Sequence, residues 1–283
     1  MSSSGQQVSQ PLSDSDLNTV RIYILQTAVA FLLYGVYITL SIIALCILLS
    51  KGLSLSSSAN AKPRVALFTL TILMLVFSTM SLVLYINFIL IQFETLAYDP
   101  PQWDVIGLLK DIEIVGIFTD RMNYLISDGI VIWRAWIMFP HNIIVRTILV
   151  ICMIGSFVGT FVDAGMGTAR FLHDARDNGN GKKGNLFLTM ALPLIITNAV
   201  ATGVIGWKAW CHHKDIKQNL NLITNPISRV QKVLLLLVES GVVYCALWIA
   251  YTVTSFIGGS ESVSYQVYSA AMPYLSVSIF LPC

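Results

Sequence analysis

Charged residues are scarce in this chain. Only 11% of its 283 residues are Asp, Glu, Lys or Arg, whereas soluble domains carry about 25%. Hydrophobic residues make up 55%, and the mean hydropathy is +0.73. The net charge of +2 is too small to indicate a nucleic-acid partner, and none is predicted. This composition is typical of an integral membrane protein.

Several reactive groups are missing from the places where specific functions need them. No histidine lies in a hydrophobic run, which argues against an intramembrane zinc hydrolase, and no metal site is predicted. The last hydrophobic run has no lysine that a retinal Schiff base requires. Neither a glycine-rich phosphate loop nor a nucleophile elbow is present. We therefore predict no cofactor, no catalytic residue and no enzymatic activity.

Seven hydrophobic runs are long enough to cross the ~30 Å hydrocarbon layer as helices of about 20 residues. They lie at about 22–49, 65–93, 114–139, 143–163, 186–210, 230–257 and 265–282. Helices are expected because backbone groups in lipid must bond within the segment, and the alternating pattern of a barrel is absent. The predicted fold is all-α, with a transmembrane domain over 21–283. A disordered tail, residues 1–20, precedes it and has no signal-peptide core.

Lysine and arginine are unevenly distributed between the connections. Ten lie in or beside the first, third and fifth connections, and six lie on the opposite side. The positive-inside rule assigns the richer side to the cytoplasm. The N-terminus is therefore predicted outside and the C-terminus inside, in the plasma membrane or an endomembrane. Four of the six outer cations lie in the fourth connection, where Asp174 and Asp177 partly offset them.

A Trp-cation-Ala-Trp stretch occurs twice, 74 residues apart. The copies are Trp133-Arg134-Ala135-Trp136 and Trp207-Lys208-Ala209-Trp210. Both end helices that are predicted to run inward, so both fall at the inner interface, where Trp rings and long cationic side chains anchor a helix. The alternative is a duplicated helix-hairpin unit, because the match extends upstream to Gly129 and Gly203.

The third run carries a polar stripe. At ~100° per residue, an arc of about 160° holds Asp120, Arg121, Asn123, Tyr124, Ser127, Asp128 and Arg134. An ionisable residue in a spanning helix costs about 2.5–3.5 kcal/mol on insertion scales. The stripe should therefore face the bundle interior and find partners. We predict a polar intramembrane cluster that acts as a ligand or switch site; the alternative is a packing seam that only holds this helix in the centre.

Other runs supply partners for Asp128. When depth is aligned by the two Trp motifs, Asn198 and Thr202 lie level with Tyr124 and Asp128. Glu239 lies in the inner half of the sixth run, where it requires a partner or a proton. Gly241 beside it allows a neighbouring helix to approach closely. The predicted cluster comprises Asp120, Arg121, Tyr124, Asp128, Asn198, Thr202 and Glu239.

Three stretches, LISDGIVIWRAWIMFP, TNAVATGVIGWKAW and LLLVESGVVYCALW, resemble a family of uncharacterised seven-helix integral membrane proteins of mushroom-forming (basidiomycete) fungi. The resemblance covers the third to sixth runs and extends loosely to the first two. It implies a seven-helix fold but no mechanism, because no activity is established for that family. The chain departs from the family by stopping at Cys283, directly after Pro282, so a shortened C-terminus is expected.

Three functional classes remain open. A receptor-like bundle, which senses a small or lipidic ligand and signals to a cytoplasmic partner, is favoured by the topology and by the polar third run ending near Arg134. A transporter with a polar site between the third, fifth and sixth helices is favoured by the similarity of the third and fifth runs. A membrane-embedded lyase or cyclase would use Asp128 and Glu239 as acid and base. The lipid bilayer is a partner in every case.

Overall fold

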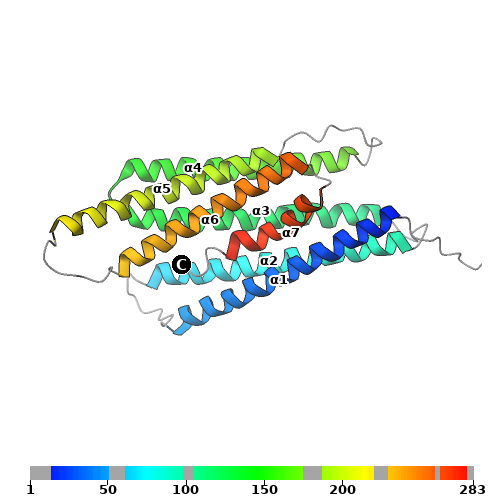
Figure 1. Ribbon diagram of the computed structural model, residues 1–283, viewed down its shortest axis with the longest axis horizontal. Helices are drawn as coiled ribbons and strands as arrows, with labels where there is room; N and C mark the ends of the chain where they lie inside the picture. Colours follow the sequence, from blue (N-terminus) through cyan, green and yellow to red (C-terminus); the bar gives the residue numbers. More distant parts are fainter. Residues whose placement is uncertain are drawn as a thin grey trace, which may run out of the picture.

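Seven α-helices form the protein in a computed structural model that describes residues 14–50, 61–97, 105–174, 187–219, 229–258 and 262–278 (Figure 1). They are α1 (Asp14–Ser50), α2 (Ala61–Ala97), α3 (Val105–Met138), α4 (Ile143–Asp174), α5 (Phe187–Asn219), α6 (Arg229–Gly258) and α7 (Val263–Ser278). The predicted all-α, seven-helix architecture is confirmed, and each helix overlaps one predicted run.

Most helices are longer than the runs that predicted them. α1 begins at Asp14, so residues 14–20 are helical and do not belong to a disordered tail, while residues 1–13 lie outside the described residues. α3 begins at Val105 instead of 114, and α4 ends at Asp174 instead of 163. Hydropathy identifies only the apolar part of a helix, which lies in hydrocarbon. The helix itself continues into polar sequence at its ends, because its hydrogen bonding does not depend on hydropathy.

Five helices are long and apolar enough to cross a membrane. The segments are Leu17–Ser50, Val65–Phe93, Ile143–Ala169, Leu188–Cys211 and Leu234–Ile257. α3 has sufficient length, but its interior charges lower its hydropathy, and the described part of α7 has only 16 residues. The chain is therefore an integral membrane protein with several spans, and the crossing of the membrane by α3 and α7 stays a prediction.

The outer faces of the helices are covered by large apolar side chains. Leu32, Ile143, Leu235 and Ile257 are among them, and Ile257 is 83% exposed. Soluble proteins rarely expose contiguous apolar surface of this kind. Lipid therefore covers these faces, as the composition predicted.

The orientation can be tested with epitope tags. A tag within residues 2–10 should be accessible on intact cells, whereas a tag within 214–225 should become accessible only after permeabilisation, because the inner connections hold most Lys and Arg. Antibody labelling with and without permeabilisation measures both. Tags that report the same side would contradict the seven-span topology.

The helices form a closed bundle in which α3 is largely enclosed by its neighbours. Each helix packs against the next in the chain, and α7 packs against α1. α3 contacts α5 and α7 as well, and Figure 1 shows it between the α4–α5 pair and the α1–α2 pair. Of its described side chains, only Leu108, Asp111, Val115 and Ile137 are exposed. The enclosure predicted for the helix with the polar stripe is present.

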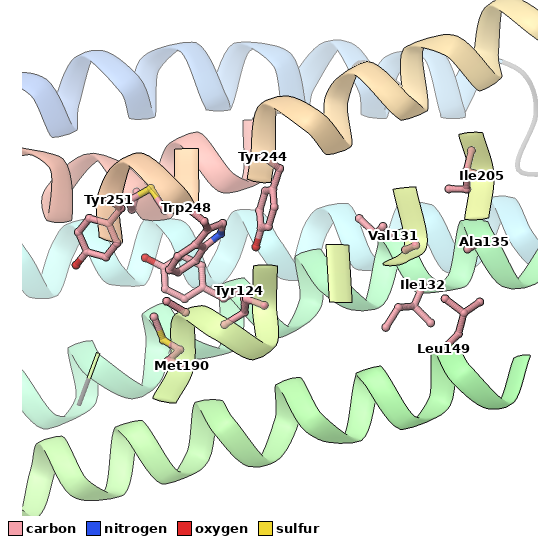
Figure 2. Close-up of a cluster of buried hydrophobic side chains, with 14 of the residues drawn as sticks. Tyr124, Val131, Ile132, Ala135, Leu149, Met190, Ile205, Tyr244, Trp248 and Tyr251 are labelled. Atoms are coloured by element: carbon pink, nitrogen blue, oxygen red, sulfur yellow. The ribbon is translucent and has the colours of Figure 1, made fainter. Parts of the chain in front are cut away.

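Aromatic side chains connect α6 to α3 in the largest apolar core. Trp248 has no exposed surface, and its ring centroid lies 5.1 Å from that of Tyr124 in an edge-on contact. Tyr244 and Tyr251 flank it, at centroid distances of 6.2 and 5.9 Å. In Figure 2 Tyr244 and Trp248 point from α6 toward Tyr124 on α3. Edge-on aromatic pairs add about 0.5–1.5 kcal/mol beyond their buried area, so this column couples the two helices.

Candidate functional site

Asp128 lies at the centre of a buried hydrogen-bond network. Its side chain has no exposed surface. Asn198 Nδ2 donates to Oδ1 at 2.5 Å, Ser156 Oγ donates to Oδ2 at 3.0 Å, and the Tyr244 hydroxyl donates to Oδ1 at 3.3 Å. A buried carboxyl group needs such partners. Because the donors belong to α5, α4 and α6, one side chain of α3 joins four helices. These four residues are called the Asp128 hub below.

The hub continues between α4 and α5. The hydroxyls of Ser156 and Thr197 share a hydrogen bond of 2.7 Å. Thr197 Oγ1 also lies 3.1 Å from the main-chain carbonyl oxygen of Cys152, to which it donates. Ser156 therefore keeps a second partner besides Asp128, and the network ends on backbone, not on solvent.

A glycine and a proline bring α4 close to α5. Pro193 has no N–H, so the carbonyl of Thr189, four residues earlier, lacks its helical donor. Gly159 lies against this position: a Cβ on Gly159 would be 2.7 Å from the Thr189 carbonyl oxygen and 2.8 Å from Pro193 Cγ. Only a residue without a side chain permits this approach. The close crossing brings Ser156 of α4 within hydrogen-bond distance of Thr197 of α5.

Gly159→Ala should destabilise the bundle by about 1–3 kcal/mol, because the added methyl group needs space that α5 occupies. Thermal unfolding in detergent measures the effect. Gly155→Ala is the matched control, since Gly155 is exposed on the same helix and a Cβ there meets nothing within 4 Å. The control should be neutral or slightly stabilising, because alanine favours the helix. Equal unfolding temperatures in the two variants would contradict the close crossing.

The depth of α5 relative to α3 differs from the prediction by one helical turn. Asn198 donates to Asp128, and Lys208 Nζ donates to the main-chain carbonyl of Met138; in both pairs the residue numbers differ by 70. The alignment of the Trp motifs predicted a difference of 74, which placed Thr202 level with Asp128. The shift is about 6 Å. The hydrogen-bonded pairs between α3 and α5 therefore follow a different register from the Trp motifs.

Thr202 contacts α6 and is not a partner of Asp128. A Cβ on Gly241 would overlap the hydroxyl and methyl groups of Thr202. The close helix approach predicted for Gly241 is therefore present, and Thr202 is the residue that uses it.

Glu239 does not join the Asp128 hub, contrary to the prediction. Its side chain is exposed on α6. The inward face of this helix carries Leu234, Gly241, Tyr244 and Trp248, which are buried. Glu239 precedes Gly241 by two positions, which turns it about 200° away from that face. The position of a residue in the sequence indicates its depth in a helix but not the neighbours it faces.

Arg121 pairs with Asp163 of α4. Its Nη2 and Nε atoms lie 2.9 and 3.0 Å from Asp163 Oδ2. The guanidinium also lies over the ring of Tyr124, 5.9 Å from its centroid. The two side chains are 21% and 8% exposed, so opposite charges compensate one another where water is sparse. Arg121 and Asp128, two turns apart on α3, thus have separate partners.

Asp120 faces α2 and borders a cavity. Ser81 Oγ donates to its Oδ1 at 2.5 Å. The cavity has a volume of about 290 Å³ and lies between α1, α2, α3 and α7. Its polar lining consists of Ser81, Tyr85, Glu113, Asp120, Ser269 and Tyr274. It is called the α3–α7 cavity below. Within the described ranges, no three His, Cys, Asp or Glu side chains gather to hold a metal ion.

The two Trp motifs occupy different surroundings. Trp207 and Trp210 are exposed, with ring centroids 5.6 Å apart. Trp133 and Trp136 are partly buried, and Arg146 lies 4.8 Å from the centroid of the Trp136 ring. Trp207 is 65% exposed and so is not buried against Trp133, a contact that would have favoured the duplicated unit. The exposed rings favour the anchor interpretation, which stays a prediction.

The sequence analysis did not predict four of the residues that bond to the polar stripe. They are Ser81, Ser156, Asp163 and Tyr244. Asp163 carried a usable signal, since an acidic residue next to an apolar run requires a partner; the predicted run ended at this residue and so placed it at the interface. The hydroxyl residues carried none, because Ser and Tyr also occur in helices without such a role.

Comparison with protein families, with curated proteins and with solved structures finds no match. The resemblance to seven-helix proteins of basidiomycete fungi stays a prediction. The helices and their exposed apolar faces establish a coarser identity. The chain is a polytopic helical membrane protein with a buried polar network at its centre.

Proposed function

We propose that this chain is a receptor-like membrane protein, in which a small or lipidic ligand enters the α3–α7 cavity and changes the Asp128 hub through α3. One observation carries the proposal: the cavity and the hub share the central helix. Asp120 lines the cavity and Asp128 holds the hub, eight residues apart. This separation is about 12 Å along a helix, so α3 links the two sites as a single rigid element.

Tyr124 lies halfway between the two sites on α3. It packs against the buried ring of Trp248, which in turn contacts Tyr244 of the hub. A ligand that bonds to Asp120 shares its carboxylate with Ser81 and so alters the contact between α2 and α3. A shift of α3 then strains the hub, whose donors come from three other helices. Such a ligand changes the conformation only if it binds the two states with different affinity.

In the predicted orientation the two Trp motifs lie at the cytoplasmic end of α3 and α5. A change in the hub therefore reaches Arg134 and the connections that are rich in Lys and Arg. We propose that a cytoplasmic signalling partner binds at this end. The family resemblance is compatible with a seven-helix receptor but adds no ligand.

A transporter is the second proposal, supported by the polar groups between α3, α5 and α6. Partners from four helices surround Asp128, however, and the void beside Arg134 and Thr202 has a volume of only about 10 Å³. This space is too small for a solute. No enzymatic role is proposed, since Asp128 is fully buried whereas Glu239 is exposed on the outside of α6.

Trp248 fluorescence tests the receptor proposal. The full chain in nanodiscs is screened by thermal shift against small amines, alcohols, carboxylic acids and lysolipids. Each stabilising compound is then titrated while tryptophan emission is followed. The emission should change in the wild type and not in Trp248→Phe. Asp128→Asn should bind the compound with unchanged affinity. It should lose the emission change, because asparagine keeps the hydrogen bonds of the hub but cannot carry the charge of the carboxylate.

Two outcomes contradict the receptor proposal. Binding that leaves the emission of Trp248 unchanged shows that the cavity and the hub are not coupled. Uptake of the bound compound into proteoliposomes, without such a change, favours the transporter. Asp111→Asn serves as a control, because Asp111 is an exposed acidic residue on the same helix.

A further inference from the structure

We infer that the α3–α7 cavity binds a small organic cation, a protonated amine whose ammonium group bonds to Asp120 and whose apolar body lies against the aromatic lining. The biological role of such a ligand rests on the proposed function. The binding itself stands whether or not the chain signals.

The cavity is lined by two acidic residues and by no basic residue. Asp120 and Glu113 lie on the same side of α3, two helical turns apart, and none of the lining residues is Lys, Arg or His. Arg121 pairs with Asp163 on the α4 side and also attracts Asp120, so one guanidinium is shared between two carboxylates and leaves negative charge uncompensated. A carboxylate in apolar surroundings requires a compensating charge. An ammonium ion supplies that charge, whereas a carboxylate or phosphate ligand would add to the repulsion.

Two hydroxyl donors of the lining already have acceptors within the protein. Ser81 Oγ donates to Asp120 at 2.5 Å, and the Tyr85 hydroxyl donates to Gln26 Oε1 at 3.0 Å. The carboxylate of Asp120 has further lone pairs free to accept, since each carboxylate accepts about four hydrogen bonds. The lining therefore favours a ligand that brings N–H donors.

A proline adds one more acceptor to the wall. Pro273 lies within α7 and has no N–H, so the main-chain carbonyl of Ser269, four residues earlier, lacks its helical donor. Both residues line the cavity. The acceptors thus come from α3 and α7, on two sides of the space, which suits an ammonium group with three N–H bonds.

The size and apolar lining of the cavity indicate an organic ligand. Its volume of about 290 Å³ far exceeds the ~15 Å³ that one water needs. Leu84, Phe88 and Ile117 line it beside the carboxylates, and so does the ring of Tyr274. The negative face of an aromatic ring attracts a cation. A bare metal ion would leave this apolar lining without a partner, so a small amine with an apolar body fits better.

Three compounds with the same skeleton test the charge: 2-phenylethylamine, 2-phenylethanol and phenylacetate. Each is titrated into the full chain in nanodiscs, and the unfolding temperature and the heat of binding are measured. The amine should raise the unfolding temperature in proportion to its occupancy. The neutral alcohol should bind at least tenfold more weakly, because it cannot form a charge-assisted hydrogen bond, and the anion should not bind.

Variants locate the amine. Asp120→Asn keeps an acceptor for Ser81 and should weaken amine binding at least tenfold. Glu113→Gln should weaken amine binding less, and it tests the site if the Asp120 variant does not fold. Asp111→Asn, an exposed acidic residue on α3 that does not line the cavity, should leave binding unchanged. The inference is wrong if the alcohol binds as tightly as the amine, if none of the three binds, or if both cavity variants retain the amine.

The outcome separates this inference from the proposed function. Charge-selective binding that depends on Asp120, without any change in Trp248 emission, supports the cation site and contradicts the receptor. If only neutral or lipidic ligands change the Trp248 emission, the result supports the receptor and contradicts the cation site.

Discussion

Asp128→Leu should destabilise the bundle by about 3 kcal/mol. Leucine removes the acceptor for one N–H bond of Asn198 and for one hydrogen bond of the Tyr244 hydroxyl, and a hydrogen bond lost at a buried polar group costs about 1–3 kcal/mol. The other N–H bond of the Asn198 amide keeps the Leu194 carbonyl as its acceptor. Ser156 contributes less to this loss, because its hydroxyl also bonds to Thr197. Unfolding in detergent, followed by loss of tertiary structure, measures the difference from the wild type.

Asp128→Asn is the informative comparison. An asparagine keeps an oxygen that accepts from Asn198 and Tyr244, and its amide group donates to Ser156 Oγ, since a hydroxyl both donates and accepts. The stability should therefore stay within about 1 kcal/mol of the wild type. If Asp128 also carries a signal, the asparagine variant loses the response to ligand while its stability is retained. Equal stability of the leucine and asparagine variants would contradict the hub as a structural element.

Asp163→Leu should also cost about 3 kcal/mol, since it leaves the Arg121 guanidinium without its partner inside the bundle. Removing one member of a buried pair costs about 3–5 kcal/mol. The lower end applies because Arg121 is 21% exposed. Thermal unfolding of the purified chain reports the loss, with Asp111→Leu as a control that removes an exposed acidic residue from α3.

The double variant Arg121→Met with Asp163→Leu tests whether the two charges act as a pair. Apolar side chains of similar length fill the space without a charge to compensate, so the double variant should be more stable than Asp163→Leu alone. Strictly additive effects of the two substitutions would show that the charges are not coupled.

Local properties of the sequence were sufficient for the class of protein and for its helices. A long apolar run in lipid must form its backbone hydrogen bonds within itself, as a helix does. The number and approximate positions of the helices therefore follow from composition and length. The enclosure of α3 was predictable on the same ground. A helix that carries Asp120, Arg121 and Asp128 cannot face lipid without a cost of several kcal/mol, and the structure packs it against α2, α4, α5 and α7.

Only the tertiary structure decided which polar groups meet. A helix end frays or extends by several residues, so a run of sequence indicates the depth of a residue only to within a turn. α5 lies one turn from the depth that its Trp motif predicted, which exchanges Thr202 for Asn198 as the partner of Asp128. The rotation of α6 points Glu239 outward and Tyr244 inward.

Close packing between helices sets these depths and rotations. Gly159 lies against the backbone of α5, and Gly241 lies against Thr202, so each fixes how far one helix slides and turns on its neighbour. Such contacts depend on both surfaces at once, and no single run contains them. The same reason applies to the α3–α7 cavity, which is the space that four helices leave between them around Asp120. The polar residues are a property of the sequence, but their partners and the cavity follow from packing.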